Sequence, residues 1–385
     1  MKKAVSFILV FVIICGLFSS VQAYALKPLT DRELQITAPS AVLMEKETGQ
    51  ILYKKNADER RPPASITKIM TLLLIVEDIE SGKISLTDTV TVSKRAASFG
   101  GSCVYLEEGE RMSVDEMLKC IAVVSANDCA VAMAEHLSGT EQAFVERMNE
   151  RAKELDLKDT HFTNCTGLFD DDDHYTTACD VAVMSRELIS HDLIKNYSTI
   201  WMDSIRGGEF QLSNTNKLVN RYEGCTGLKT GYTSTAKYCL SATAERDGME
   251  FIAVVMGSKD SELRNSDAAA LLNFGFANFT LCHLRRDEPL PALTVEMGKS
   301  STLPLKYAGE EYALVPKGNG NPAYELCLPQ SVKAPVKQGQ ILGEMLVRTE
   351  EGKELARIPI MADKDVPKLG FFGIFGMLGK SLFGL

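Results

Sequence analysis

The chain has 385 residues, a formal net charge of −9 at pH 7, and 45% hydrophobic against 24% charged residues. This length is ample for a buried core and exceeds one typical domain of ~100–200 residues, so we expect two domains. No basic run or basic–aromatic patch is present, which argues against a nucleic-acid partner. The acidic charge is compatible with a soluble protein body.

The N-terminus has the pattern of a secretory signal peptide. Met1-Lys2-Lys3 is followed by an apolar run, Ala4–Phe18, and by small residues that lead to Ala23. A basic start, a short apolar core and a small-residue end are the parts of such a peptide. The apolar run is shorter than the ~20 residues that a spanning helix needs. We therefore expect residues 1–23 to be removed and the protein to be exported.

Removal of this peptide takes away Cys15 and leaves nine of the ten cysteines. An odd number cannot pair completely within one chain, and the sequence leaves the pairing open. Neither the cysteines nor the five histidines have metal-ligand spacing. We expect no metal and no cofactor.

Residues 27–285 contain early strands, a run of helices and late strands. Two apolar stretches within Ala41–Tyr53 predict a hairpin. Apolar periodicity, a capping box at Ser113–Glu116 and stop signals at Ser81-Gly82 then predict helices over 65–80, 117–124, 128 onward and 140–155. Strands are predicted over 237–243 and 250–256, joined by a hairpin turn at Arg246-Asp247-Gly248, with a helix over 266–279 that packs on them. The pattern predicts an α+β fold in which helices flank an antiparallel sheet.

Residues 289–363 are different in texture, because short β-rich stretches alternate there with Gly, Pro and Glu-Gly turns. This pattern predicts a small all-β domain. In the final segment, 366–385, one apolar stripe would form on a helix from Phe371, Ile374, Phe375, Leu378 and Leu382. Gly370, Gly373, Gly376 and Gly379 each cost about 1 kcal/mol relative to alanine, so the helix needs an apolar surface. We expect an amphipathic anchor on the membrane surface; a terminal helix packed on the protein's own core is the alternative.

Three short motifs occur in chain order: Ser65-Ile66-Thr67-Lys68, Ser125-Ala126-Asn127 and Lys229-Thr230-Gly231. Together, each beside a suitable secondary element, they indicate one serine acyl-transfer site. Serine is a weak nucleophile that needs a nearby base. Lys68 shares a helix face with Ser65, and a lysine shielded from water has a lowered pKa.

The other two motifs supply groups that a peptide substrate needs. The Ser125 hydroxyl can relay a proton between Lys68 and the leaving amine, and the Asn127 amide can hold a substrate carbonyl. A cation and a hydroxyl, from Lys229 and Thr230, suit a terminal carboxylate at a strand edge. Gly231 removes a side chain that would block a substrate along that strand.

Each motif alone has a simpler structural explanation. Ser65 would be an ordinary helix cap and Lys68 an exposed charge, and the second motif would be a pair of capping residues. The third motif would be a turn before a strand. Only the combination of all three motifs favours the catalytic interpretation.

The chain resembles the low-molecular-mass penicillin-binding proteins that are D-alanyl-D-alanine carboxypeptidases. The resemblance covers nearly the whole length. It includes the segments Pro63–Thr71, Ser125–Asp128, His161–Asn164, Gly167-Leu168, His174–Ala178 and Gly227–Thr233. It implies the penicillin-binding/serine β-lactamase-like transpeptidase fold, followed by a β-rich domain and an amphipathic tail helix.

The resemblance also implies a role for each motif residue. Ser65 would be the nucleophile, Lys68 its base and Ser125 the proton relay. The substrate would be bound by Asn127, Lys229, Thr230, Gly231 and Arg264. The backbone N–H groups of Ser65 and Tyr232 would form the oxyanion hole.

The implied reaction removes the terminal D-alanine from peptidoglycan stem pentapeptides through an acyl-enzyme on Ser65. β-Lactams would acylate the same serine, and the enzyme would lie on the outer face of the cytoplasmic membrane. A serine β-lactamase is one alternative, with Glu107 or Asp170–Asp173 as the deacylating carboxylate. A non-catalytic cell-wall scaffold is another, which the complete set of motif residues disfavours.

Two features depart from the family pattern. Asp170–Asp173 is an acidic run where a shorter loop is expected; we interpret it as a solvated surface loop, with a cation site as the alternative. Cys225, just before the third motif, is unusual, and the sequence offers no explanation for it.

Overall fold

The computed structural model describes residues 34–169, 171–284, 289–308, 312–318, 322–350, 352 and 354–370. This part of the chain divides into two compact units, and the division falls between Asn278 and Phe279 in the sequence. Each unit has a hydrophobic core of its own.

The first unit is built on a five-stranded antiparallel sheet with the order β2-β1-β9-β8-β7. The strands are β1 (Ser40–Glu45), β2 (Ile51–Lys55), β7 (Cys225–Thr233), β8 (Lys237–Arg246) and β9 (Met249–Ser258). The early hairpin joins the late strands because β1 pairs with β9. The predicted turn between β8 and β9 forms, with positive φ at Asp247 and Gly248.

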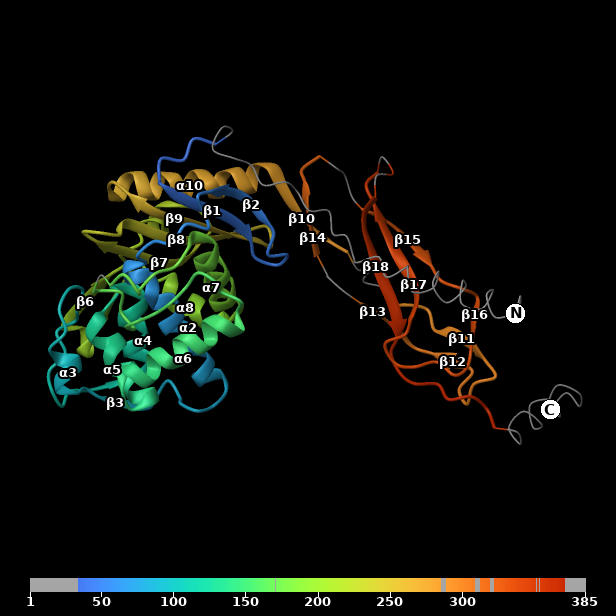
Figure 1. The fold of residues 1–385 in the computed structure, drawn as a ribbon, viewed down its shortest axis with the longest axis horizontal. Coiled ribbons are helices and arrows are strands. Elements are labelled where there is room, and N and C mark those ends of the chain that lie inside the picture. The colour runs from blue at the N-terminus through green and yellow to red at the C-terminus, as the bar shows by residue number, and fades with distance from the viewer. Residues whose placement is uncertain are drawn as a thin grey trace, which may run out of the picture. The chain divides into compact units, whose positions relative to one another are not determined.

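Helices cover both faces of this sheet (Figure 1). One face carries α10 (Ser261–Asn278), and the other carries a helical region. That region contains α2 (Lys68–Glu80), α3 (Lys94–Ala97), α4 (Val114–Val123), α5 (Asn127–Ser138), α6 (Glu141–Glu154), α7 (Ala178–Ser190), α8 (Asp192–Ser198) and α9 (Leu218–Arg221). Two small β-ribbons lie in the same unit: β3 (Thr89–Thr91) with β4 (Arg111–Ser113), and β5 (Met202–Ile205) with β6 (Phe210–Ser213). The α+β prediction is confirmed.

Local sequence signals explain most element boundaries. The capping box is present, because Ser113 and Glu116 exchange side-chain and backbone hydrogen bonds at the start of α4. Two expectations need correction: α10 begins at Ser261 rather than 266, and the helix expected from Ser65 begins as a 3₁₀ turn, η1 (Ala64–Thr67), before α2. The α2 side chains Ile69, Leu72 and Leu73 are fully buried. Each such burial contributes roughly 1.5–3 kcal/mol, which fixes the helix that carries Lys68.

The second unit is all β in the part that the structure describes, as predicted. Its ladders are β10 (Phe279–His283) with β14 (Tyr312–Pro316), then β12 (Thr302–Leu303)-β11 (Leu293–Glu296)-β16 (Ser331–Lys333), and β13 (Leu305–Tyr307)-β18 (Glu354–Ala362)-β17 (Ile341–Arg348)-β15 (Ala323–Cys327). All pairs are antiparallel except β11 with β16. Strand β10 belongs here although it precedes residue 285.

The predicted signal peptide, 1–23, and the tail stripe from Phe371 to Leu382 lie outside the described residues. The first part of the predicted tail segment is extended rather than helical. Val366 pairs with Val336, and Lys368 pairs with Gly298. Among the helices that the structure describes, none has the length and apolar character needed to cross a bilayer.

Candidate active site

The first motif forms a tight turn that leads into a buried helix. Ala64 has a φ of 48°, and Ser65 follows it on η1, half-buried. Lys68 opens α2, and its Nζ lies 3.1 Å from Ser65 Oγ. The three-residue spacing therefore places the amine and the hydroxyl in hydrogen-bond contact.

Lys68 is fully buried, and neutral oxygens surround its amine. Nζ donates to Ser65 Oγ, to Asn127 Oδ1 at 2.5 Å and to the Thr166 carbonyl at 2.8 Å. Burial lowers the pKa of Lys68 to about 7, against smaller opposing effects of Cys165, Cys103 and Asp128. At neutral pH a substantial fraction of this amine is therefore unprotonated and able to accept a proton.

The second motif lies between α4 and α5. Ser125 has a φ of 65° and is 3% exposed, and its Oγ has no hydrogen-bond partner among the described residues. Asn127 begins α5; its Oδ1 accepts from Lys68, and its Nδ2 donates to the Gly100 carbonyl at 2.8 Å. The Asn127 amide is thus oriented from two sides.

The third motif lies on β7, the edge strand of the sheet. Lys229 is 1% exposed, and its Nζ donates to the Thr230 carbonyl at 2.8 Å. Burial lowers the pKa of Lys229 strongly, and the positive charges of Lys68 and Arg264 lower it further. Thr230 donates its hydroxyl hydrogen to Thr215 Oγ1 at 2.7 Å.

Gly231 is where β7 packs against the nucleophile turn. A Cβ added at Gly231 would lie 3.1 Å from the backbone nitrogens of Ser65 and Ile66 and 3.0 Å from the Pro63 carbonyl. Only glycine allows this approach without a shift of the backbone. The first and third motifs therefore meet through their main chains.

Tyr232 and Arg264 both lie beside the ring of Tyr238. The Tyr232 ring is 55% exposed and stacks on Tyr238 at 4.5 Å, and the Arg264 guanidinium lies 6.0 Å from the centre of the same ring. Arg264 is 5% exposed and donates to Asn265 Oδ1 at 3.1 Å. Burial lowers its pKa.

Some contacts of the site had no sequence signal. The Thr166 carbonyl and Thr215 come from outside the motifs, and a backbone acceptor is invisible in a sequence. The segment His174–Ala178 was one of those that carry the family resemblance. The resemblance did not indicate that this segment contacts the first motif. His174 nevertheless bonds to Thr67.

The two unusual features lie beside the site rather than in it. Asp170 lies outside the described residues. Asp171 accepts a hydrogen bond from the backbone of Asp173, and Asp171–Asp173 are exposed, as expected of a surface loop. They line a 540 Å³ cavity that also touches Pro62 and Thr235, close to the first and third motifs. Cys225 begins β7 at a bulge, with its Sγ 3.3 Å from the Gly227 carbonyl.

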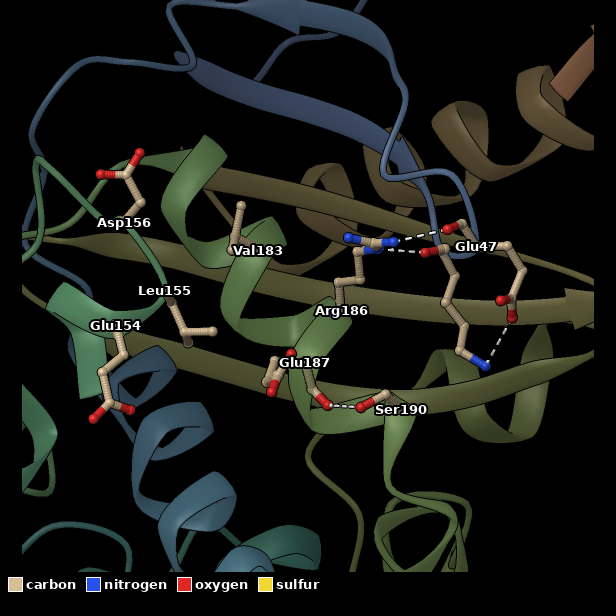
Figure 2. Close-up of a pocket in the computed structure, with 9 residues that line it drawn as sticks. Glu47, Glu154, Leu155, Asp156, Val183, Arg186, Glu187 and Ser190 are labelled. Carbon is tan, nitrogen blue, oxygen red and sulfur yellow. Dashed lines mark hydrogen bonds and ion pairs between the residues drawn. The ribbon is translucent and has the colours of Figure 1, made fainter. Parts of the chain in front are cut away.

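A separate cavity of about 470 Å³ lies between α6, α7 and the β1–β2 turn (Figure 2). In it Arg186 points toward the turn and donates to the carbonyls of Lys46 and Glu47, which ties α7 to the hairpin. Nearby, ligand atoms of Glu77, Glu187 and His191 lie within 4.8 Å of one another. The Arg151 guanidinium bonds both glutamates, so this group has an internal counter-charge.

Comparisons with known proteins agree with this fold. Residues 27–260 match the family described as D-alanyl-D-alanine carboxypeptidase, and residues 283–368 match the C-terminal domain of penicillin-binding protein 5. The chain is 43% identical over 345 residues to D-alanyl-D-alanine carboxypeptidase DacF of Bacillus subtilis, with 88% of each chain covered. It is 32% identical over 349 residues to DacA of Escherichia coli, covering 88% of this chain and 86% of the relative.

Solved structures give the same answer. Penicillin-binding protein 5 from Haemophilus influenzae superposes with a TM-score of 0.77 at 31% identity, over 89% of this chain and 100% of that one. Penicillin-binding protein 6B from Escherichia coli gives 0.71 at 31% identity, over 87% and 97%. The fold and the comparisons together define a serine peptidase of the low-molecular-mass penicillin-binding class. The chain belongs to the D-alanyl-D-alanine carboxypeptidase family, which confirms the resemblance.

Proposed function

We propose that Ser65 is the acylated nucleophile of this carboxypeptidase and that Lys68 is its general base. The observation that carries the proposal is the 3.1 Å contact between Lys68 Nζ and Ser65 Oγ, made by a buried amine whose pKa is lowered to about 7. A neutral amine at hydrogen-bond distance can take the hydroxyl proton as the oxygen attacks.

The acylation step follows from this arrangement. Ser65 Oγ bonds to the carbonyl carbon of the penultimate D-alanine, and its proton moves to Lys68 Nζ. The N–H groups of Ser65 and Tyr232 hold the oxygen of the tetrahedral intermediate. The C–N bond then breaks, and the amine of the terminal D-alanine leaves with a proton that Ser125 passes on from Lys68. The buried Ser125 hydroxyl supports this relay, because it is not engaged by any described residue.

Deacylation returns the enzyme to its first state. A water molecule attacks the ester carbon and loses a proton to Lys68, and Ser65 Oγ leaves and is reprotonated. The products are free D-alanine and the shortened stem peptide. A β-lactam would form the same ester through its ring carbonyl and leave slowly.

Substrate binding uses the positive side of the site. Lys229, Thr230 and Arg264 would face the terminal carboxylate, since two cations and a hydroxyl gather beside β7. Asn127 would hold a peptide carbonyl or amide, and Gly231 would let the peptide lie along the open edge of β7.

The location of the enzyme is a further part of the proposal. The N-terminal pattern of residues 1–23 supports export, and the apolar stripe in 371–382 supports attachment of the enzyme to the outer face of the cytoplasmic membrane. This location would bring the site to peptidoglycan stem peptides.

Labelled penicillin and a short peptide test the proposal. Wild type should release D-alanine from diacetyl-L-Lys-D-Ala-D-Ala, and mass spectrometry should find one penicillin adduct, on Ser65. Ser65→Ala should lose both. An adduct on another side chain, or release of D-alanine by Ser65→Ala, would refute the assignment. Rapid loss of the penicillin adduct would instead favour a β-lactamase.

A further inference from the structure

We infer that His174 is a positioning residue for acylation, acting on the Ser65 turn through the hydroxyl of Thr67; the inference rests on the proposed role of Ser65. The turn needs such support. Ala64, the residue before Ser65, has a φ of 48°, a backbone angle that residues other than glycine rarely adopt. Its carbonyl and the Ser65 N–H belong to one peptide group, so any tilt of that group moves a proposed oxyanion-hole donor.

The hydrogen bonds at this turn fix a single direction of donation. Thr67 donates its hydroxyl hydrogen to the Ala64 carbonyl at 2.8 Å. The His174 Nε2 lies 2.8 Å from the same Thr67 oxygen. Because the only hydroxyl hydrogen of Thr67 goes to Ala64, Nε2 must be the donor.

The other ring nitrogen agrees with this assignment. His174 Nδ1 lies 3.0 Å from the backbone nitrogen of Thr163, which can only donate. Nδ1 is therefore an acceptor without a proton, and the ring is neutral with its hydrogen on Nε2. Two independent contacts thus select the tautomer that directs the Thr67 hydroxyl toward Ala64.

The backbone around His174 holds the ring in place. The two residues that follow it are bridged, Tyr175 to His161 and Thr176 to Arg61, and Arg61 lies just before the nucleophile turn. His174 is 3% exposed, and its ring packs edge-to-face with the ring of Phe162, with the two ring centroids 5.9 Å apart. The position of the His174 ring is therefore fixed by its surroundings, so its hydrogen bond can hold the Thr67 hydroxyl in one orientation.

The loop that precedes His174 in the chain also contacts the turn directly, through Thr166 and Gly167. A Cβ at Gly167 would lie 1.8 Å from the Ala64 carbonyl and 2.6 Å from Thr67 Oγ1. The neighbouring Thr166 carbonyl accepts from Lys68. Residues 166, 167 and 174 thus contact the Ala64 carbonyl, the Thr67 hydroxyl and the Lys68 amine. These contacts explain how His174 can affect acylation without touching substrate.

Two neutral substitutions separate the nitrogens of His174. In His174→Gln the amide nitrogen can reach the position of Nε2 and still donate to Thr67. In His174→Asn the amide oxygen can reach the position of Nδ1 and accept from Thr163, but nothing reaches Thr67. We expect His174→Gln to keep the penicillin acylation rate within about threefold of wild type, and His174→Asn to lose about 10- to 100-fold. With the diacetyl-L-Lys-D-Ala-D-Ala peptide, kcat should fall while KM stays nearly constant.

Thr67 tests the same contact from the other end. Thr67→Val should lose acylation to a similar degree, whereas Thr67→Ser should retain it. Adding His174→Asn to Thr67→Val should cost less than a further twofold, because the contact is already gone. These variants also decide the question if His174→Asn does not fold.

The outcomes divide cleanly. A loss in His174→Asn but not in His174→Gln, together with non-additivity in the double variant, supports the inference. Equal rates in the two histidine variants, or fully additive losses, overturn it. A wild-type enzyme that forms no Ser65 adduct would instead defeat the proposed function, so the two failures are distinguishable.

Discussion

A half-buried arginine and a set of three buried cations lie in the same unit and differ in the groups that surround them. At one end of α2, Arg151 donates to Glu77 and Glu187, at 2.8 and 2.6 Å. At the other end of the helix lies the candidate active site, with three cations: Lys68, Lys229 and Arg264. Their described hydrogen bonds are all donated to neutral carbonyl, hydroxyl or amide oxygens.

The difference shows what decides the proton affinity of a buried cation. Burial by itself would lower the pKa of Arg151, but its hydrogen bond to Glu77 and the charges of Glu187 and Glu154 raise it overall. Lys68 has no such counter-charge in its hydrogen bonds, so burial lowers its pKa to about 7. A paired cation stabilises the fold, whereas an unpaired one is left ready to lose a proton or to bind an anion.

The largest effect should come from removing the unpaired amine. Lys68→Met keeps the length of the side chain but removes the base, so we expect penicillin acylation to fall by about 10³-fold or more. The melting temperature should stay the same or rise, because a buried charge is replaced by an apolar group. Stopped-flow acylation and thermal unfolding measure the two effects. A variant that acylates within tenfold of wild type would exclude Lys68 as the base.

The pH dependence of acylation should report the same amine. Only neutral Lys68 can accept the Ser65 proton, and its pKa is lowered to about 7. The acylation rate constant should therefore rise with pH, about tenfold per unit below pH 7, and level off above it. At pH 5 this predicts a rate about 100-fold below the plateau. A flat profile between pH 5 and 9 would mean that another group accepts the proton.

Removing the second unpaired lysine should affect substrate choice. Lys229→Met should lower kcat/KM for the diacetyl-L-Lys-D-Ala-D-Ala peptide by about 10- to 100-fold, because the terminal carboxylate loses a cation. The same peptide with a C-terminal amide should be affected much less. Lys217→Met, at an exposed position, is the control. Equal losses for acid and amide would show that Lys229 does not meet the carboxylate.

The smallest effect on activity should come from the paired cation. Arg151→Met leaves Glu77 and Glu187 without their shared partner, which costs about 1 kcal/mol and lowers the melting temperature by about 2–4 °C. Acylation should stay at the wild-type rate. Lys68→Met and Arg151→Met should thus have opposite effects on stability and activity. Impaired acylation in Arg151→Met would remove the distinction between the two groups.

The sequence predicted caps and turns better than the residues at which helices begin. The capping box at Ser113–Glu116 and the turn before Gly248 were foreseen because neighbouring residues determine them. The start of α10 at Ser261 and the 3₁₀ turn at Ala64 were missed. At α10 the missed signal is local, because the Asp260 side chain accepts from the backbone N–H groups of Glu262 and Leu263. The turn at Ala64 packs against Gly167, and periodicity carries no information about such a contact.

The candidate site divides in the same way. Its residue types and the contact of Ser65 with Lys68 follow from three-residue spacing on one turn. The His174 contact spans 107 residues of sequence, and no local pattern indicated which atom it would meet.

Residue chemistry and local geometry were thus set by the sequence alone: a serine beside a lysine, helices and strands with their caps and turns, and the family to which they belong. The tertiary structure alone decided the state of that lysine. Its amine is enclosed by Asn127 and Thr166, which lie 59 and 98 residues away in the chain. Desolvation depends on what surrounds a group in space, so the pKa of Lys68 could not be read before the chain was folded.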